Sequence, residues 1–373
     1  MLDKINLSKK ILVHLEECGI KSEENLVLKE KNDYRNAHFF QRQEKIVKNE
    51  KFLITAIKKY SQYFANGEDI DPCRIKVRIE EVMAGSIESE LFRLCTLYWS
   101  VPVSEGYGRR MRFIVWDEYN GKIIGIFALG DAVFNLKARD DYIGWSSEDR
   151  KNKLVNIMDA YILGAIPPYN VLLGGKLIAS IIKSTDVAHA FRKKYKNSVG
   201  LISGDKKNPY LTAVTVTSAL GRSSVYNRLK LNNELIFKKI GMTSGWGHFH
   251  FSDEIFSEMV ILLKNEGDNL FNTYEFGSGP NWRIRVIKKA LNHLGLSERI
   301  MKHGYLREIY ISEFSLDFKK ILLSKKNKPN YSTLNSVDII SQEAIDRWIL
   351  PRSTRNSSYL NIYKNDFFLS LKN

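Results

Sequence analysis

The strongest structural signal in this sequence is a pair of strand-like runs joined by a short turn. Residues 111–117 (MRFIVWD) and 122–129 (KIIGIFAL) are both rich in β-branched and other apolar side chains. Asn120-Gly121 lies between them, and this dipeptide is the strongest short-range signal for a β-hairpin. We therefore expect an antiparallel hairpin here, as part of a central sheet.

Strand patterns and helix patterns alternate around this hairpin. Ile75, Val77 and Ile79 repeat with the period of two that is typical of a half-buried strand. The further expected elements are helices at 147–159, 174–183 and 224–229, and strands at 160–166, 211–217, 235–240 and 308–313. This succession predicts an α+β fold with a central mixed β-sheet flanked by helices.

Helical patterns dominate both ends of the chain. An apolar stripe at helical spacing runs from Leu53 to Phe64, and further helices are expected near 255–265, from Pro280 and in the tail. We predict three regions, which are a helical N-terminal region at 1–70, a central α/β core at 71–252 and a helical C-terminal region at 253–373.

The charge balance indicates a polyanionic partner. The 373 residues include 57 lysines and arginines against 42 aspartates and glutamates, which leaves a formal net charge of +15. Nucleic acid is the commonest partner for such a surplus, although a merely soluble basic protein would show it too. We expect DNA to be the partner.

Cysteine usage and hydropathy predict the compartment. Cys18, Cys73 and Cys95 are odd in number and lack CxxC or CxxH spacing, which argues against a disulfide framework and a zinc site. The first ten residues, MLDKINLSKK, contain no apolar signal core. No run approaches the roughly 18 apolar residues that a membrane span needs. We expect a cytoplasmic protein without a membrane partner and without a bound metal.

Three groups of cationic residues are candidates for contact with DNA. A glycine-rich segment at 277–279 leads through Pro280 into a helix whose cationic face suits a run of phosphates. The other groups are an arginine cluster beside Tyr107 and a basic turn rich in hydroxyl groups. The candidates are Arg283, Arg285, Lys288 and Lys289 on the helix, Arg109, Arg110 and Arg112 in the cluster, and Arg222 and Arg228 in the turn. The alternative for each is a solvated surface.

The segment 167–176 could bind a phosphate group. An apolar strand ends at Pro167-Pro168, and Gly174-Gly175-Lys176 follows at the start of a helix. Free N–H groups and the positive end of a helix hold anions, glycine permits close backbone approach, and Lys176 adds charge. Gly174, Gly175 and Lys176 are therefore candidate cofactor-binding residues, although the cofactor stays unknown. The alternative is an ordinary strand–helix turn.

Two further constellations could carry chemistry. Arg139, Asp140 and Asp141 could form an acid–base pair or bind the metal of a nuclease, or they could pin the hairpin to the next helix. Asp140 and Asp141 are adjacent, so on a regular strand they would diverge. Tyr226 is the candidate proton donor of a transfer reaction, unless it only packs its ring and bonds its hydroxyl group.

Two other patterns concern metals and nucleotides. His248 and His250 would face one side of a strand, as in some metal sites, but no cysteine or third ligand is near. We therefore favour a structural or stacking role for them. The sequence contains no GxxxxGK[ST] loop, so an ATPase is not expected.

Four blocks of the sequence resemble the DruA family of the Druantia anti-phage system. They are 104–113 (SEGYGRRMRF), 125–145 (GIFALGDAVFNLKARDDYIGW), 163–179 (LGAIPPYNVLLGGKLIA), and 224–251 through to 279–285 (GPNWRIR). The resemblance implies a bacterial, cytoplasmic protein with a role in defence against phage. It also implies partner proteins from the same system, including a helicase that would supply the missing ATPase.

The order of the central elements is also similar to that of GNAT-type acyltransferases. Phage DNA-modifying proteins of that fold carry a Tyr-x-x-x-hydrophobic pattern before the last strand, and residues 226–229 (YNRL) would occupy that place. The usual coenzyme A loop (Q/R-x-x-G-x-G/A) is absent, and Gly174-Gly175-Lys176 replaces it only in part. Three functions stay open, which are a DNA-binding component of a defence complex, a GNAT-like transferase that modifies a nucleobase or another acceptor, and a metal-dependent nuclease. The oligomeric state is open as well, and a homo-oligomer is among the options.

Overall fold

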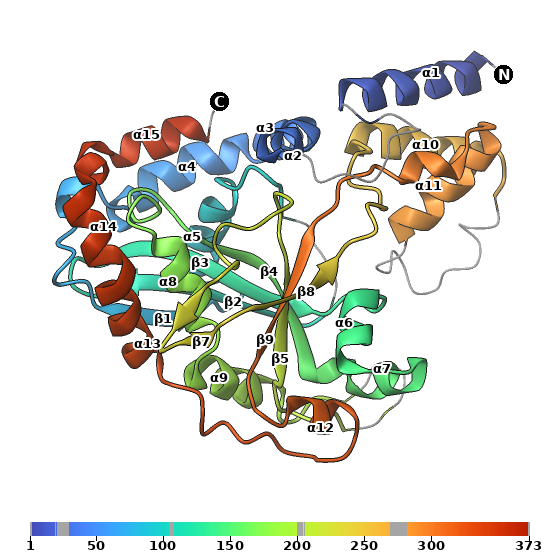
Figure 1. Cartoon of the computed structure of the whole chain (residues 1–373). Coiled ribbons are helices and arrows are strands. Elements are labelled where there is room, and N and C mark those ends of the chain that lie inside the picture. The colour runs from blue at the N-terminus through green and yellow to red at the C-terminus, as the bar shows by residue number, and fades with distance from the viewer. Residues whose placement is uncertain are drawn as a thin grey trace.

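The predicted hairpin lies inside a seven-stranded sheet in the computed structural model (Figure 1). The structure describes residues 2–18, 20, 30–103, 108–199, 204, 206–268 and 282–371. The strand order is β1-β2-β3-β4-β5-β9-β8, and β6 and β7 form a separate pair. The strands are β1 (Val77–Glu81), β2 (Arg110–Asp117), β3 (Lys122–Asp131), β4 (Ile157–Ala165), β5 (Ala213–Thr217), β6 (Lys230–Leu231), β7 (Glu234–Leu235), β8 (Lys238–Met242) and β9 (Glu308–Glu313).

The hairpin of β2 and β3 is confirmed. Its turn is a four-residue loop, because Asp117 pairs with Lys122, and Gly121 takes the left-handed conformation there with a φ of 68°. Phe113 stacks on Phe127 across the two strands, with ring centroids 4.6 Å apart. Such cross-strand aromatic pairs stabilise a sheet and fix its register.

β4 and β5 are the parallel pair that makes the sheet mixed. Their pairing is restricted to 157–159 against 213–215, although β4 continues beside β3 as far as Ala165. The register between β3 and β4 shifts at Tyr161, which is the extra residue of a β-bulge. The two parallel strands therefore separate after Asp159, towards the C-terminal end of β4.

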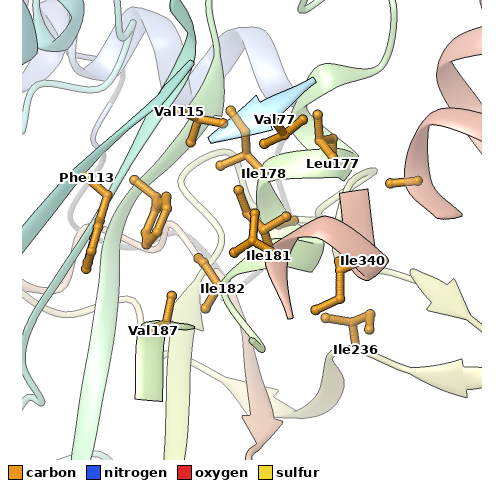
Figure 2. Close-up of a cluster of buried hydrophobic side chains, with 14 of the residues drawn as sticks. Val77, Phe113, Val115, Leu177, Ile178, Ile181, Ile182, Val187, Ile236 and Ile340 are labelled. Atoms are coloured by element: carbon orange, nitrogen blue, oxygen red, sulfur yellow. The ribbon is translucent and has the colours of Figure 1, made fainter. Parts of the chain in front are cut away.

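One face of the sheet carries the largest hydrophobic core. The helices on this face are α8 (Gly174–Ile181), α9 (Thr185–Tyr195) and α13 (Val337–Ala344). Figure 2 shows Val115 and Val77 of the sheet beside Ile178 and Leu177 of α8, and Ile340 of α13 beside Ile236, all within this core. This packing follows from the apolar sequence of α8, which is buried along most of its length.

The other face has two smaller cores. The first lies under α4 (Glu50–Tyr60), α5 (Ile87–Thr96) and α15 (Lys364–Ser370), and the second lies under α6 (Lys137–Ile143) and α12 (Phe318–Leu322). Further helices beside the sheet are α2 (Lys31–Ala37), α3 (Phe39–Lys48), α7 (Ser147–Lys153), a π-helix (Ile345–Ile349) and α14 (Leu350–Arg355).

A separate helical layer consists of α1 (Leu2–Glu17), α10 (Asp253–Asn265) and α11 (Trp282–His293), as Figure 1 shows. Leu7 and Ile11 on α1 share one core with Met259 on α10 and Ile287 on α11. Since α10 and α11 are inserted between β8 and β9, the first helix packs against elements from the last third of the chain. The predicted α+β class, with helices around a mixed sheet, is confirmed. Among the described residues no helix combines the length and apolar character needed to cross a membrane.

Two element predictions need new boundaries. The helix expected at 147–159 ends at Lys153, and β4 already begins at Ile157. The reason is tertiary, because the Asn156 carbonyl accepts the N–H of Thr212 at 2.9 Å and starts the pairing with β5. The strand expected at 235–240 is divided between β7 and β8.

The short helix expected at 224–229 is wrong, since this segment is a series of turns. The Ser223 hydroxyl accepts the N–H groups of Val225 and Tyr226 at 3.1 and 2.9 Å. Arg228 has a φ of 64°, which a right-handed helix does not allow. Local side-chain bonding therefore prevails over the helical pattern.

Candidate functional site

A half-buried carboxyl group lies where β4 and β5 separate. Asp159 on β4 accepts hydrogen bonds from the Thr215 hydroxyl on β5 and, at 2.8 Å, from the Val133 N–H. Burial raises the pKa of Asp159 to about 6, against the opposing effects of the Val133 N–H and the Arg139 guanidinium. A carboxyl group with this pKa can exchange a proton near neutral pH, which is typical of functional sites.

A second carboxylate lies close to Asp159. Asp131 at the end of β3 forms an ion pair with Arg109, whose Nε is 2.7 Å from Oδ1. The Arg109 N–H donates to the other oxygen at 2.8 Å, and the guanidinium lies 5.1 Å from the Tyr195 ring centroid. The negative charge of Asp131 contributes to the raised pKa of Asp159. Arg109 thus acts as the counter-ion of Asp131 in this structure.

Arg139 and Asp140 form a closed ion-pair network. Arg139 is fully buried and donates to one Asp140 oxygen at 2.7 and 2.9 Å. It also donates to the carbonyl groups of Val133 and Phe134 at 2.6 and 2.9 Å. Arg150 on α7 donates to the second Asp140 oxygen at 2.7 Å. Both carboxylate oxygens are bound by arginines, so the geometry is that of a clamp between α6, α7 and the end of β3.

This clamp gives little support to a metal site. Asp141 is exposed on α6, whereas Asp140 faces the arginines. Within the described ranges, no group of three or more histidine, cysteine, aspartate or glutamate side chains is placed to hold a metal ion. His250 is buried, and its Nε2 donates to the Ile300 carbonyl at 3.1 Å, as a structural histidine does.

The Gly174-Gly175-Lys176 turn lies at the start of α8, as predicted. The N–H groups of Gly174 and Lys176 donate to carbonyl groups of the preceding loop, at 2.9 and 2.8 Å. Lys176 Nζ lies 5.6 Å from the Trp348 ring centroid, and the Val171 carbonyl accepts a bond from Arg352 at 3.1 Å. The C-terminal helices therefore cover part of this turn. Two of its N–H groups and its lysine already have partners, so the turn is a poor fit to the pyrophosphate of coenzyme A.

Tyr226 lies in the loop after β5 and packs against the main core. Its ring centroid is 5.2 Å from Phe237 and 5.6 Å from Tyr310. Burial raises the pKa of the Tyr226 hydroxyl above its usual value, which weakens it as a proton donor. These contacts agree with the packing role that we gave as the alternative for this residue.

Glu308 on β9 anchors the same loop. It is 2% exposed, and it accepts hydrogen bonds from the Tyr310 hydroxyl, from Lys239 at 2.7 Å and from the Ser223 N–H at 3.2 Å. Burial alone would raise the pKa of Glu308, but these three donors together hold it below its usual value. Arg222 Nε is 3.7 Å from this carboxylate, while its side chain stays 70% exposed.

The candidate DNA-contacting residues on α11 have acidic neighbours. Three of these four cations form ion pairs with carboxylates of α10 or of the segments beside α11. The pairs are Arg283 with Asp253 at 2.9 Å, Lys288 with Glu298 at 2.8 Å and Lys289 with Asp268 at 2.6 Å. Arg285 lies on the same helix. The net charge of this helix surface is therefore lower than its own sequence indicates.

The other candidate cations lie at the start of β2 and in the loop after β5. The Arg110 guanidinium lies 4.1 Å from the Tyr161 ring centroid, and that of Arg112 lies 5.8 Å from Phe92. Arg222 and Arg228 are both exposed in the loop after β5. The structure thus places the nine candidates at three separate locations, which are the start of β2, the loop after β5 and α11.

Asp159 and Glu308 are the candidate site residues that the sequence analysis missed. Each is a carboxylate within a strand of mostly apolar residues. Charged residues are rarely buried unless they are paired, so an acidic residue inside an apolar run is the signal that could have found them.

Together, these features define a basic α+β protein with a mixed sheet, an inserted helical layer and paired buried charges. The family model described as "Druantia protein DruA" matches residues 28–324. The Druantia protein DruA of Escherichia coli (strain UMEA 4076-1) is 45% identical over 376 residues, which cover 100% of this chain and 93% of that relative. No solved structure matches the chain significantly. The chain belongs to the DruA family and is a component of a Druantia anti-phage system.

Proposed function

We propose that this protein is a DNA-binding component of its anti-phage system and works beside a helicase of the same system. The observation that carries the proposal is the charge surplus of +15. Among the described residues, Arg139 is the one lysine or arginine that is fully buried, and Asp140 compensates its charge. The other described lysines and arginines are at least partly exposed, so the surplus lies on the surface, where it can contact phosphates. Proteins of this kind release counterions when they bind a nucleic acid, and the affinity then falls steeply with salt.

A salt titration tests this proposal. We expect the full chain to bind a fluorescent 25-base-pair duplex at 50 mM salt, with little dependence on its sequence. The logarithm of the binding constant should fall linearly with the logarithm of the salt concentration, with a slope of about −0.9 for each phosphate that the protein neutralises. Binding that is absent at 50 mM salt, or that does not change with salt, would refute the proposal.

A second candidate function is a GNAT-like transferase that modifies a nucleobase or another acceptor. The parallel pairing of β4 with β5, their separation after Asp159 and the helix that follows β4 support a GNAT-like core. The N–H groups of Gly174 and Lys176 already donate to carbonyl groups, and the Lys176 ammonium lies over the Trp348 ring, which disfavours coenzyme A binding at that turn. Thermal unfolding with and without 1 mM acetyl-coenzyme A separates the two cases, since a ligand that binds the folded state raises the midpoint. An unchanged midpoint would remove coenzyme A as the donor.

A further inference from the structure

Cationic side chains from three segments gather at one end of the sheet. The segments are the last turn of α9 with residues 196–199, the segment 206–210, and α12 with residues 323–330, and Figure 1 shows α9 and α12 at the same end of the molecule. We call their exposed cations the basic pole. The basic pole consists of Arg192, Lys193, Lys196, Lys206, Lys319, Lys320, Lys325 and Lys328.

Direct contacts join these three segments. The Asn208 side chain donates to the Asn327 carbonyl at 3.0 Å, which ties the middle segment to the chain after α12. The Arg192 guanidinium on α9 lies 5.0 Å from the ring centroid of Tyr210 in the middle segment. The fold therefore holds cations that are more than 100 residues apart in the sequence on one surface.

The chain also folds back at the end of α12. Ser324 takes the left-handed conformation with a φ of 60°, and the N–H of Lys325 donates to the Lys320 carbonyl at 2.7 Å. This turn brings two exposed lysines together although their charges repel. Packing of the apolar residues of α12, such as Ile321 and Leu322, stabilises the arrangement.

Ion pairs are scarce among the described residues of this surface. Asp317 belongs to the same segment and pairs with Lys326, so Lys326 is not a member of the basic pole. Throughout the described ranges, no carboxylate forms an ion pair with a member of the basic pole, in contrast to the cations of α11. Helix C-termini favour cations, but that effect acts within one turn and does not explain Lys206 or Lys328.

We propose that the basic pole is the surface that binds the phosphate backbone of DNA. This inference rests on the proposed function and names the surface that performs it. Uncompensated like charges raise the local potential, and a phosphate polymer relieves their repulsion by matching several of them at once. Tyr210 adds a neutral side chain of a type that contacts phosphate and sugar. Such contacts carry no sequence information, so the surface binds duplexes of any sequence.

An anionic membrane surface is the competing polyanion. Val199 is 57% exposed and Leu316 is 87% exposed beside the basic pole, and apolar side chains next to cations are also found where proteins meet lipid headgroups. Two side chains offer little apolar area compared with the helix faces that insert into membranes, so we favour the nucleic acid. The membrane is therefore included as a second arm of the experiment.

The test compares two triple variants of the full chain with equal loss of charge. The first replaces Lys193, Lys320 and Lys325 of the basic pole with glutamine. The control replaces Lys51, Lys58 and Lys59 with glutamine, which are exposed on α4 away from α9 and α12 (Figure 1). All six side chains are at the surface, so equal thermal unfolding midpoints should confirm that both variants fold. Each is titrated with the 25-base-pair duplex and with vesicles that contain phosphatidylserine.

We expect the basic-pole variant to bind the duplex at least about tenfold more weakly at 100 mM salt, with a salt slope that is shallower by about 0.9 for each phosphate that it no longer neutralises. The control variant should bind within about twofold of the original protein. If the original protein binds DNA and the basic-pole variant binds it equally well, the inference is overturned while the proposed function stands. If the original protein binds no DNA, the proposed function fails first. Vesicle binding that is abolished only in the basic-pole variant, with DNA binding intact, would assign this surface to a membrane instead.

Discussion

Mild acid should unfold this protein because several histidines are buried as neutral rings. His38, His250 and His303 surround Phe249, with centroid distances from Phe249 of 4.3 Å to His38 and 4.6 Å to His303. Burial lowers the pKa of His38 to about 4 and that of His250 and of His303 to about 3. The positive charge of Arg307 lowers the pKa of His38 and His303 further.

The size of the effect follows from proton linkage. An unfolded histidine has a pKa near 6.5, so the stability due to each buried ring is complete above pH 6.5 and is lost as the pH falls towards the folded-state pKa. Below pH 6.5, each pH unit lowers the free energy of unfolding by about 1.4 kcal/mol per ring. At pH 5 the loss is about 2 kcal/mol per ring and about 6 kcal/mol for the three rings. Asp159 has the opposite effect, because its pKa of about 6 in the folded protein means that the folded state takes up a proton more readily than the unfolded state. This proton uptake raises the free energy of unfolding by about 1.4 kcal/mol between pH 7 and pH 5. The net loss of about 5 kcal/mol is comparable to the whole stability of many domains.

Urea unfolding followed by tryptophan fluorescence at pH 7.5, 6.5, 5.5 and 5.0 measures this loss. We expect the free energy of unfolding to be nearly constant down to pH 6.5 and then to fall. The variant His250→Gln should reduce the slope below pH 6 by about 1.4 kcal/mol per pH unit, since one titrating ring is removed. The matched variant His189→Gln, at an exposed position on α9, should leave the slope unchanged. A free energy that stays constant from pH 6.5 to 5.0 in the original protein would refute the reasoning.

Four further substitutions should change the stability, and urea unfolding can measure each effect. Gly174→Ala should destabilise the fold by about 1–3 kcal/mol, because its Cβ would lie 2.7 Å from the Tyr169 carbonyl oxygen. A Cβ at Gly175 would meet no atom within 4 Å, so Gly175→Ala should stabilise the fold by about 0.5–1 kcal/mol. Equal effects of the two substitutions would contradict the geometry of the turn. Arg139→Met should cost about 3–5 kcal/mol by leaving a buried carboxylate with one partner fewer, and a cost below about 1 kcal/mol would show that the clamp is not structural. Phe127→Ala should cost about 3–5 kcal/mol, and a much smaller loss would mean that the stacked pair is not part of a rigid core.

Local patterns were sufficient where an element is determined by its own residues. The hairpin around Gly121 and the strand at 308–313 occur as predicted, because turn chemistry and β-branched runs act over a few residues. The helix expected at 224–229 failed, because the Ser223 hydroxyl competes for the backbone N–H groups. The start of β4 also escaped prediction, since its parallel partner β5 lies more than 50 residues further along.

The candidate site was less predictable because it depends on distant partners. Asp159 becomes a candidate because Thr215 and Val133, which are distant in the sequence, donate hydrogen bonds to it in the folded protein. The cations of α11 looked uncompensated, but carboxylates on α10 and neighbouring segments pair with three of them. The segment 277–281, which leads into that helix and includes the glycine-rich start, lies outside the described residues, as does Tyr107 beside the arginine cluster. The charge composition alone predicts a polyanionic partner. Where the excess positive charge lies on the surface can be seen only in the folded structure.

The shared core of α1, α10 and α11 has a consequence for synthesis on the ribosome. α1 is synthesised well before α10 and α11, so Leu7 and Ile11 cannot be buried in their final core until α11 has been made. At roughly 5–20 residues per second, translation needs on the order of 15–55 s to reach that point. During this interval the apolar side of the first helix is open to chaperones and to other nascent chains.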